Sequence, residues 1–572
     1  MKKNNFYIIT IAFTAAIGGF LLGFDGSVIS GAVPFYKQVF GLQDGSFMLG
    51  FSVSCIIWGA IFGNLSAGPL CDKIGRKPSL LIAALLFAAT GIICAFATTI
   101  EVFIAGRIIG GLGVGIAILV APIYIAEISP AKKRGWLVSF NQLLIVIGLS
   151  AAYFSNYFIL KKVTDPLTNW RWMLGIETIP AVLYFIAVLF IPESPRWLIM
   201  QGKDEKAVQI ITKIEGDAYA RKEYEEIKKN MLAGTKISVA VQAKELFSKK
   251  MKLILVIGFG LAILQQFSGI NAILYYAPMV FESAGGGRDA AFMQAIVLGV
   301  VFVFMTIISM FLIDRLGRKP LLYIGVGLMA LSLTGTGLLF KNARYKIEQK
   351  EIETSAASVY KDELWAAAKK NDPSLKGYDE FVLDSRTATF SKQNKVISSV
   401  DLTENNTKII TSRNDIFIEK LSGLKGAVFN TELQFFKAIN TSLTGTAINS
   451  ESYKSLLLKD GIKINAVLVL ISILGFIAGF SISLGPVMWA MLSEIFPNRL
   501  RGLAISLVGA ANAVCSFIVA TFFPVQLARF GSSGTYFIYA GFMYLCLWFI
   551  YRYVVETKGK SLEQLEKELT RS

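Results

Sequence analysis

The chain has 572 residues, of which 54% are hydrophobic, and it carries a formal net charge of +17. A water-soluble protein of this length with this hydrophobic fraction would expose large apolar patches, so the composition excludes that class. The basic residues are scattered over short segments between apolar runs, which excludes a concentrated patch for nucleic acid. The sequence contains no histidine, so any proton transfer must use carboxylates.

Apolar runs long enough to cross a bilayer recur along the chain. An α-helix needs about 20 residues to span a hydrocarbon core of ~30 Å. The first run is too long for a secretory signal and lacks a small-residue cleavage site, so we expect it to remain in the mature protein. We expect twelve spans, near residues 6–36, 47–70, 79–98, 101–125, 136–160, 172–191, 251–281, 290–313, 320–340, 464–493, 502–526 and 533–555.

The basic residues predict the orientation. The loops "DKIGRKP", "AKKRG", "DRLGRKP" and "NRLRG" follow even-numbered spans and carry 3, 3, 3 and 2 basic residues. Loops rich in Lys and Arg stay on the cytoplasmic side. Both termini are therefore expected in the cytoplasm.

Repeated motifs indicate an internal duplication. "DKIGRKP" at 72 recurs as "DRLGRKP" at 314, "AEISPAKKRG" at 126 as "SEIFPNRLRG" at 493, and "PESPR" at 192 as "VETKG" at 555. Two six-span halves with an insertion in the second half account for all three offsets. We expect an all-α membrane protein with an N-terminal bundle (1–192), cytoplasmic linker helices (193–250), a C-terminal bundle in two parts (251–340 and 464–555), an extracytoplasmic insertion (341–463) and a cytoplasmic tail (556–572). The insertion is expected to be an accessory domain that the function of the two halves does not require.

Acidic and basic residues repeat at fixed spacings at the predicted cytoplasmic ends of the helices. Ion pairs between helices there would stabilise an outward-facing state if they form only when the inner ends are closed. The alternative is that the basic groups only set the topology. The candidate pairs are Asp72 with Arg76, Asp314 with Arg318, Glu127 with Arg134, Glu494 with Arg501, and Glu193 with Arg196.

Several amides lie inside apolar segments. "QQFSGIN" contains Gln265, Gln266 and Asn271, and Gln142 and Asn512 lie in other predicted spans. Unsatisfied amides are costly in lipid, so they are expected to face a polar cavity, as for a neutral polyol, or to bond neighbouring helices. Trp489, beside Gly485 and Pro486, offers an apolar face for such a polyol ring. The glycines of "RIIGGLGVG" predict close helix packing rather than a nucleotide loop.

Two charges are isolated inside the first-half spans. Asp25 lies in "GFLLGFDGSVISGAV", and Arg107, in "FIAGRIIGG", is the other isolated charge that we identify there. A charge at bilayer depth costs about 2.5–3.5 kcal/mol on insertion scales, so Asp25 needs a partner or a proton. Beside a cation the carboxylate stays ionised, and without one it takes a proton. The alternative is a static ion pair.

These motifs, with "PESPRWL", "YIAEISPAKKRG", "QQFSGINAILYYAP" and "ETKGKSLEQLE", resemble the sugar porter family of the major facilitator superfamily, and most resemble its bacterial D-xylose–proton symporters. The resemblance implies two bundles that rock around a central sugar site, and a pairing of Asp25 with Arg107 for proton coupling. It implies sugar contacts at Gln142, Gln265, Gln266, Asn271, Tyr275, Trp489 and Asn512. The chain departs from those symporters at Phe302 and Leu149, where they carry amides, and at Asn512, where they carry Gln.

We therefore expect proton-coupled import of a neutral monosaccharide, a pentose or a hexose, by a monomer in a bacterial inner membrane. A passive sugar facilitator is the alternative in the same class, and a non-transporting sugar sensor is the alternative in another. The expected partners are the sugar, the proton and the lipid bilayer, with no nucleic acid. We expect no enzymatic activity, no cofactor and no metal site.

Overall fold

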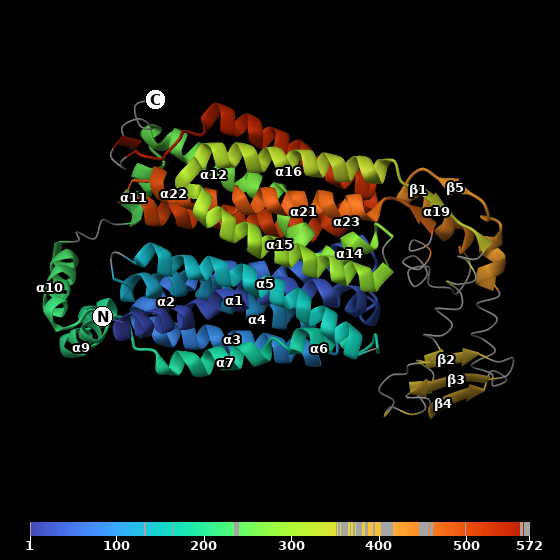
Figure 1. The fold of residues 1–572 in the computed structure, drawn as a ribbon, viewed down its shortest axis with the longest axis horizontal. Coiled ribbons are helices and arrows are strands. Elements are labelled where there is room, and N and C mark those ends of the chain that lie inside the picture. Colours follow the sequence, from blue (N-terminus) through green and yellow to red (C-terminus); the bar gives the residue numbers. More distant parts are fainter. Residues whose placement is uncertain are drawn as a thin grey trace.

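Two bundles of long helices lie side by side in this computed structural model, and both chain termini lie at one end of them (Figure 1). We call this end the terminal face and the opposite end, where the insertion lies, the insertion face. The structure describes residues 2–565, with the exception of 131–132, 164, 234–238, 286, 498, 561–563 and many positions between 350 and 460.

The N-terminal half consists of seven helices, and short helices on the terminal face connect it to the second half. The bundle helices are α1 (Lys2–Val39), α2 (Phe47–Ile74), α3 (Arg76–Phe96), α4 (Ile100–Ile128), α5 (Arg134–Lys162), α6 (Asn169–Gly175) and α7 (Thr178–Phe190). The connecting helices are α8 (Pro195–Met200), α9 (Asp204–Glu215), α10 (Asp217–Ala233), α11 (Val239–Leu246) and the 3₁₀ turn η1 (Lys249–Met251). The predicted span near 172–191 is thus two helices, α6 and α7.

The C-terminal half contains interrupted helices. Its members are α12 (Lys252–Phe267), α13 (Ile270–Tyr275), α14 (Ala277–Glu282), α15 (Gly287–Leu316), α16 (Arg318–Lys341), α21 (Ala466–Ile482), α22 (Pro486–Ile495) and α23 (Arg501–Tyr553). The predicted span 251–281 is therefore three helices, and 464–493 is two. Gly269, with φ of 84°, adopts a left-handed conformation between α12 and α13 that favours glycine.

The described helices account for twelve membrane crossings. Eleven helical segments are long and apolar enough to cross a bilayer. The last of them, α23, has 53 residues, a length of about 80 Å. It is two crossings, because Gly531 has non-helical φ and ψ of 68° and 175° and divides it. The all-α membrane fold predicted from the sequence is confirmed.

Glycines bring α2 and α4 close together, as the sequence predicted for "RIIGGLGVG". A Cβ added at Gly111 would lie 2.1 Å from the carbonyl oxygen of Ile56, and one at Gly115 would lie 2.2 Å from that of Ala60. Only residues without a side chain permit this approach. The contact fixes α4, which carries Arg107.

The insertion contains strands and a helix, none of which the sequence analysis predicted. One sheet has the order β5-β1-β6 and joins β1 (Arg344–Lys346) to β5 (Val428–Phe429) and β6 (Ile462–Lys463). A second, antiparallel sheet joins β2 (Glu380–Leu383), β3 (Thr387–Lys392) and β4 (Lys395–Asp401). Helix α19 (Glu432–Ser442) follows β5.

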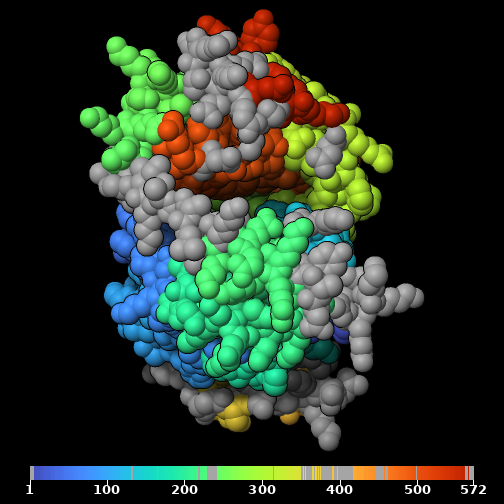
Figure 2. All heavy atoms as spheres, turned by 90° about the vertical axis from the view of Figure 1, so that its left-hand side faces the viewer, coloured from blue at the N-terminus to red at the C-terminus, as the bar shows by residue number. Residues whose placement is uncertain are grey.

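The two halves pack together on the insertion-face side. One hydrophobic core there includes residues of both halves, such as Phe35, Tyr153 and Phe292, whereas a second core contains residues of the N-terminal half and its linker only, such as Ile8, Leu80 and Ile214. The rings of Phe35 and Phe292 lie 6.5 Å apart. On the terminal face the space-filling view shows a hollow between the halves (Figure 2). The structure is thus closed at the insertion face and open at the terminal face.

Candidate functional site

A buried ion pair lies inside the N-terminal half. Asp25 of α1 and Arg107 of α4 are 0% and 1% exposed, and an Arg107 Nη1 donates a hydrogen bond to Asp25 Oδ1. Two charged groups lose their hydration at such a position, and only close pairing compensates that loss. The structure therefore brings together the two isolated charges that the sequence analysis singled out.

A third charged residue, Glu177, belongs to this site and was missed. It lies between α6 and α7, is 1% exposed, and its carboxyl group interacts with that of Asp25. The sequence analysis identified Arg107 as the other isolated charge inside the first-half spans. That was incomplete, because Glu177 is a further one. The signal was present in "GIETIP", an acid within the predicted span 172–191.

The site has two carboxyl groups and one guanidinium. Among the described residues, Asp25 Oδ2 and Glu177 Oε1 have no hydrogen-bond donor, and Arg107 Nε and Nη2 have no acceptor. Two ionised carboxylates can only accept, so neither can donate to the other. A single proton shared by the two carboxyls would supply a donor and balance the charge of the site.

Four of the predicted amides form one network in the C-terminal half. Gln266 Nε2 donates to Asn512 Oδ1 at 2.9 Å, and Asn512 Nδ2 donates to Gln265 Oε1 at 2.8 Å. Asn271 Nδ2 donates to Gln266 Oε1 at 2.8 Å and to Ser516 Oγ at 2.6 Å. The network joins α12, α13 and α23. Ser516 was not predicted, because a serine in an apolar helix usually bonds its own backbone.

Helix breaks bring backbone groups to the same network. α21 ends at Ile482 and α22 begins at Pro486, which leaves the carbonyl of Leu484 outside a helix. Gln265 Nε2 donates to this carbonyl at 2.7 Å. Irregular backbone at membrane depth is tolerated where such partners or a polar cavity satisfy it.

The other predicted sugar contacts lie outside this network. Trp489 on α22 is 41% exposed, and Gln142 on α5 is also exposed, so both side chains are accessible. Tyr275, at the end of α13, lies against α1, because its Cε1 is 3.6 Å from a Cβ added at Gly26. Helix α13 thus carries Asn271 of the network near one end and, at the other, contacts the residue that follows Asp25.

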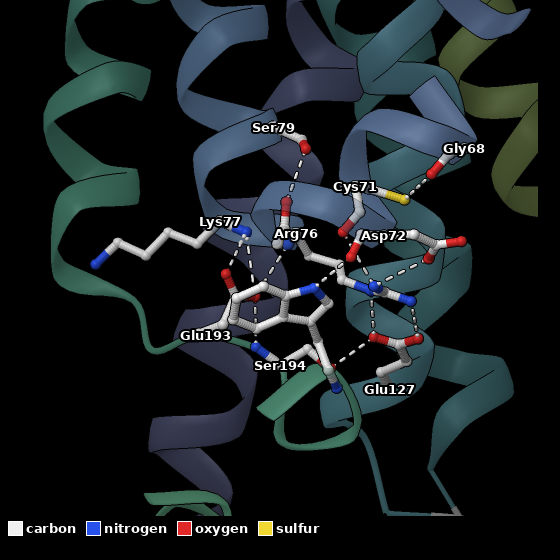
Figure 3. Close-up of polar contacts among 11 residues, drawn as sticks. Gly68, Cys71, Asp72, Arg76, Lys77, Ser79, Glu127, Glu193 and Ser194 are labelled. Carbon is white, nitrogen blue, oxygen red and sulfur yellow. Dashed lines mark hydrogen bonds and ion pairs between the residues drawn. The ribbon is translucent and has the colours of Figure 1, made fainter. Parts of the chain in front are cut away.

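An ion-pair cluster lies at the terminal face of the N-terminal half (Figure 3). Arg76 donates to Glu127 from Nε at 2.9 Å and from Nη2 at 3.0 Å, a bidentate pair, and to Asp72 at 3.3 Å. Glu193 accepts from the backbone N–H groups of Arg76 and Lys77 at 3.1 and 3.2 Å. Its carboxylate therefore caps the start of α3, where the free N–H groups and the helix dipole favour negative charge.

The C-terminal half repeats this arrangement. Arg318 donates to Glu494 from Nε at 3.1 Å and from Nη2 at 2.8 Å. Glu556 accepts from the backbone N–H groups of Arg318 and Lys319, as Glu193 does in the first half. A Cβ at Gly75 or Gly317 would lie 2.3 or 2.9 Å from the capping carboxylate, so both turns favour glycine.

Asp72 pairs with Arg76 as predicted, whereas the partners of Glu127, Glu494 and Glu193 differ from those predicted. Glu127 pairs with Arg76 rather than Arg134, and Glu494 pairs with Arg318 rather than Arg501, because the guanidinium groups at the starts of α3 and α16 lie nearer. Arg501 donates instead to the carbonyl of Phe496 at 3.3 Å. Arg196 is exposed, and Glu193 bonds backbone groups. The side chain of Asp314 lies outside the described residues.

Each of these ion pairs joins helices of one half. They are present while the halves are apart at the terminal face, so in this conformation they do not hold the halves together. Burial raises the pKa of Glu193, an effect that its backbone N–H bonds only partly offset. Burial also acts on Glu556, but four backbone N–H bonds outweigh it and lower the pKa of that carboxyl.

Comparison with known proteins relates this architecture to sugar transport. A family model described as "Sugar (and other) transporter" matches residues 11–359 and 438–569, and leaves out only part of the insertion between them. The arabinose–proton symporter of Bacillus subtilis is 31% identical, and the match covers 98% of this chain and 95% of that protein. The D-xylose–proton symporter of Escherichia coli is also 31% identical, and the match covers 99% of this chain and 96% of that protein.

Solved structures agree with the sequence matches. The xylose transporter of E. coli in an inward-open conformation aligns with a TM-score of 0.68 and 29% identity, and the match covers 98% of this chain and 100% of that one. The chain therefore belongs to the sugar transporter family of the major facilitator superfamily, and it is a transporter, not an enzyme.

Proposed function

We propose that this protein imports a neutral monosaccharide together with a proton, by alternating access between its two halves. The observation that carries the proposal is the water-excluded site of Asp25, Arg107 and Glu177, which has one carboxyl more than its cation balances. A passive facilitator has no need of such a site, which is costly in a membrane. The proton–sugar symporters among the relatives support the same activity.

The amide network is the proposed sugar site. Gln265, Gln266, Asn271 and Asn512 supply donors and acceptors in one place, which suits hydroxyl groups that do both. Trp489 and Gln142 are accessible and complete the proposed site from another helix of the C-terminal half and from the N-terminal half. Relatives named as arabinose, D-xylose and glucose transporters are each 31% identical to this chain, so both pentoses and hexoses are substrate classes to test.

Helix α13 is the proposed link between sugar and proton. Asn271 near its start bonds Gln266 and Ser516, and Tyr275 at its end contacts α1 beside Asp25. A sugar hydroxyl that competes for Asn271 would shift α13, and Tyr275 would transmit that shift to α1. Asp25 would then exchange between pairing with Arg107 and carrying a proton, as each side of the membrane opens in turn.

The proposed orientation places the terminal face in the cytoplasm of a bacterium, with the protein in the inner membrane. The basic loops "DKIGRKP" and "DRLGRKP" lie at this face, in agreement with the positive-inside rule. The arginine–glutamate clusters there are proposed to keep each half rigid while the halves rock, because their pairs lie within a half.

Uptake by purified protein in liposomes tests the proposal. A panel of labelled pentoses and hexoses is offered with and without an imposed inward proton gradient. We expect accumulation of at least one neutral monosaccharide above equilibrium only with the gradient. Equilibration that ignores the gradient would replace symport with facilitated diffusion, and binding without any flux would favour a sensor.

A further inference from the structure

Tyr153 of α5 makes a hydrogen bond from the N-terminal half to the C-terminal half. Its hydroxyl donates to the carbonyl of Leu274 on α13 at 2.8 Å, and the tyrosine is 1% exposed. Helices α5 and α15 pack together across the two halves (Figure 1). A Cβ added at Gly299 of α15 would lie 3.0 Å from Tyr153 Cδ2, so the ring contacts that helix as well. Tyr153 therefore lies where α5 meets two helices of the other half.

The carbonyl of Leu274 needs a donor from outside its own helix. A continuous α-helix would bond this carbonyl to the N–H of the residue four positions on. That residue is Pro278, in the first turn of α14, and proline has no N–H. A backbone carbonyl that is buried without a donor is costly. The Tyr153 hydroxyl supplies the donor, so the break between α13 and α14 is satisfied from the other half.

The same hydroxyl reaches α1 beside the buried ion pair. The side chains of Tyr153 and Ser27 form a hydrogen bond. A tyrosine has one O–H, which here donates to Leu274, so Ser27 is the donor to Tyr153. Ser27 is 1% exposed and lies two residues after Asp25. One hydroxyl group thus connects the helix of the proposed proton site with the helix that carries Asn271.

Close packing fixes α1 against α5. A Cβ added at Gly23 of α1 would lie 1.8 Å from the carbonyl oxygen of Ile145, and one at Gly148 of α5 would lie 2.0 Å from that of Phe20. The backbones of the two helices are therefore in direct contact. A displacement of α1 at Asp25 would carry α5 and Tyr153 with it.

We propose that Tyr153 is a positioning residue that links the proton site to the sugar site, through a chain of hydrogen bonds from Ser27 to Tyr153 to the carbonyl of Leu274. The inference rests on the proposed function and deepens it. Asp25 changes its partner when it takes a proton, and α13 carries Asn271 of the amide network. The hydrogen-bond chain makes the position of α13 depend on the state of Asp25, so that sugar and proton cross together.

The chain adds direction to the contact between α13 and α1. Tyr275 touches α1 through van der Waals contact, which tolerates sliding. Hydrogen bonds weaken steeply when they are misaligned, so the chain from Ser27 to Leu274 holds in a narrow range of positions. A tyrosine that only satisfied the Leu274 carbonyl would support the fold and would affect every mode of transport equally. The two roles therefore predict different results when the hydroxyl is removed.

Tyr153→Phe in the full-length protein removes the hydroxyl and keeps the ring. Accumulation of labelled D-xylose, arabinose and glucose in liposomes under an inward proton gradient is compared with counterflow of the same sugar without a gradient. We expect the ratio of accumulation to counterflow to fall by about fivefold or more, a typical size for coupling between two sites. Ser27→Ala should lower the same ratio. The double variant should lower it no further, since both hydroxyls belong to one chain.

Tyr124→Phe is the matched control. Tyr124 is also buried, and its hydroxyl donates to a backbone carbonyl, that of Pro192, at 2.7 Å within the N-terminal half. This variant should keep the unmodified ratio. If Tyr153→Phe does not reach the membrane, Ser27→Ala decides the test alone.

Two results would overturn the link. One is an unchanged ratio in Tyr153→Phe, and the other is an equal fall of accumulation and counterflow, which would make Tyr153 a structural brace. The unmodified protein reports separately on the proposed function. If it accumulates no sugar under the gradient, proton coupling itself fails, whereas an unchanged ratio in Tyr153→Phe beside an accumulating unmodified protein rejects only the role of Tyr153.

Discussion

Gln266 donates a hydrogen bond to Asn512 across 246 positions of sequence, with 2.9 Å between Nε2 and Oδ1. The same amide accepts from Asn271 at 2.8 Å, so one glutamine joins α12, α13 and α23. An amide that only bonds neighbouring helices could equally well bond a hydroxyl or a backbone group, whereas both neighbours of Gln266 are amides. This concentration of amides is the basis of the proposed sugar site.

Removal of Gln266 or Asn512 by substitution with Ala is expected to weaken sugar binding by about 0.5–1.5 kcal/mol, up to roughly tenfold in Kd. Titration calorimetry on purified protein measures it. Asn156→Ala is the control, because this buried amide bonds the carbonyl of Val28 within the N-terminal half and lies outside the network. Unchanged affinity in both network variants would remove them from the site.

Gly50→Ala is expected to favour the conformation that is open at the insertion face. A Cβ at Gly50 of α2 would lie 1.7 Å from the carbonyl oxygen of Thr521 on α23, so the two halves cannot close there. Overpacking of this kind costs about 1–3 kcal/mol, a shift of roughly fivefold or more.

Spin-label distances across the insertion face detect this shift. Gly68→Ala on the same helix is the control, since a Cβ there meets nothing within 4 Å. If both alanine variants give the same distances as the unmodified protein, the close approach of α2 and α23 is not a feature of the closed state.

Glu193 and Glu556 occupy equivalent positions but should respond oppositely to pH. The pKa of Glu556 is lowered, so its stabilisation is complete above the ordinary Glu value of 4.5 and is lost as the pH falls through its folded pKa. The pKa of Glu193 is raised in the folded protein. Its contribution to stability is therefore complete below 4.5 and is lost as the pH rises through its folded pKa.

Thermal unfolding of Glu556→Gln and Glu193→Gln across this pH range measures the difference. Each variant replaces a charged acceptor of backbone N–H bonds with a neutral amide oxygen, and hydrogen bonds to charged groups are worth about 1.5–3 kcal/mol. The loss of Tm from Glu556→Gln should grow as the pH rises, and that from Glu193→Gln should shrink. Parallel trends in the two variants would contradict the assignment.

Replacement of residues 345–460 by a short Gly/Ser linker is expected to leave sugar uptake largely intact. The twelve crossings are complete without this segment, and the family model does not match 360–437 within it. Loss of uptake in a variant that still reaches the membrane would show that the insertion takes a direct part in transport.

Much of the fold follows from the sequence, because length and hydropathy determine which segments can cross a membrane. The duplicated motifs also predicted which residues would repeat: Glu193 and Glu556, 363 positions apart, cap equivalent helices. The strands of the insertion were not predicted, since its polar composition carries no clear alternation.

The site was predicted less completely. Asp25 and Arg107 stood out because a charge in an apolar run is rare. Glu177 carries the same signal within the predicted span 172–191 and was overlooked. The partners of Glu127 and Glu494 were wrong because spacing along the chain does not tell which of several arginines a helix crossing brings nearest. All of the sugar contacts remain predictions, and the side chains of Gln142, Tyr275 and Trp489 lie outside the amide network.

The most direct test of the central claim is proton-driven uptake by Asp25→Asn in liposomes, with sugar counterflow measured alongside. The neutral amide resembles the protonated acid but cannot release a proton to either side. We therefore expect the variant to bind sugar and to exchange it, and to lose all accumulation under an inward proton gradient. Accumulation by Asp25→Asn in response to that gradient would contradict the account.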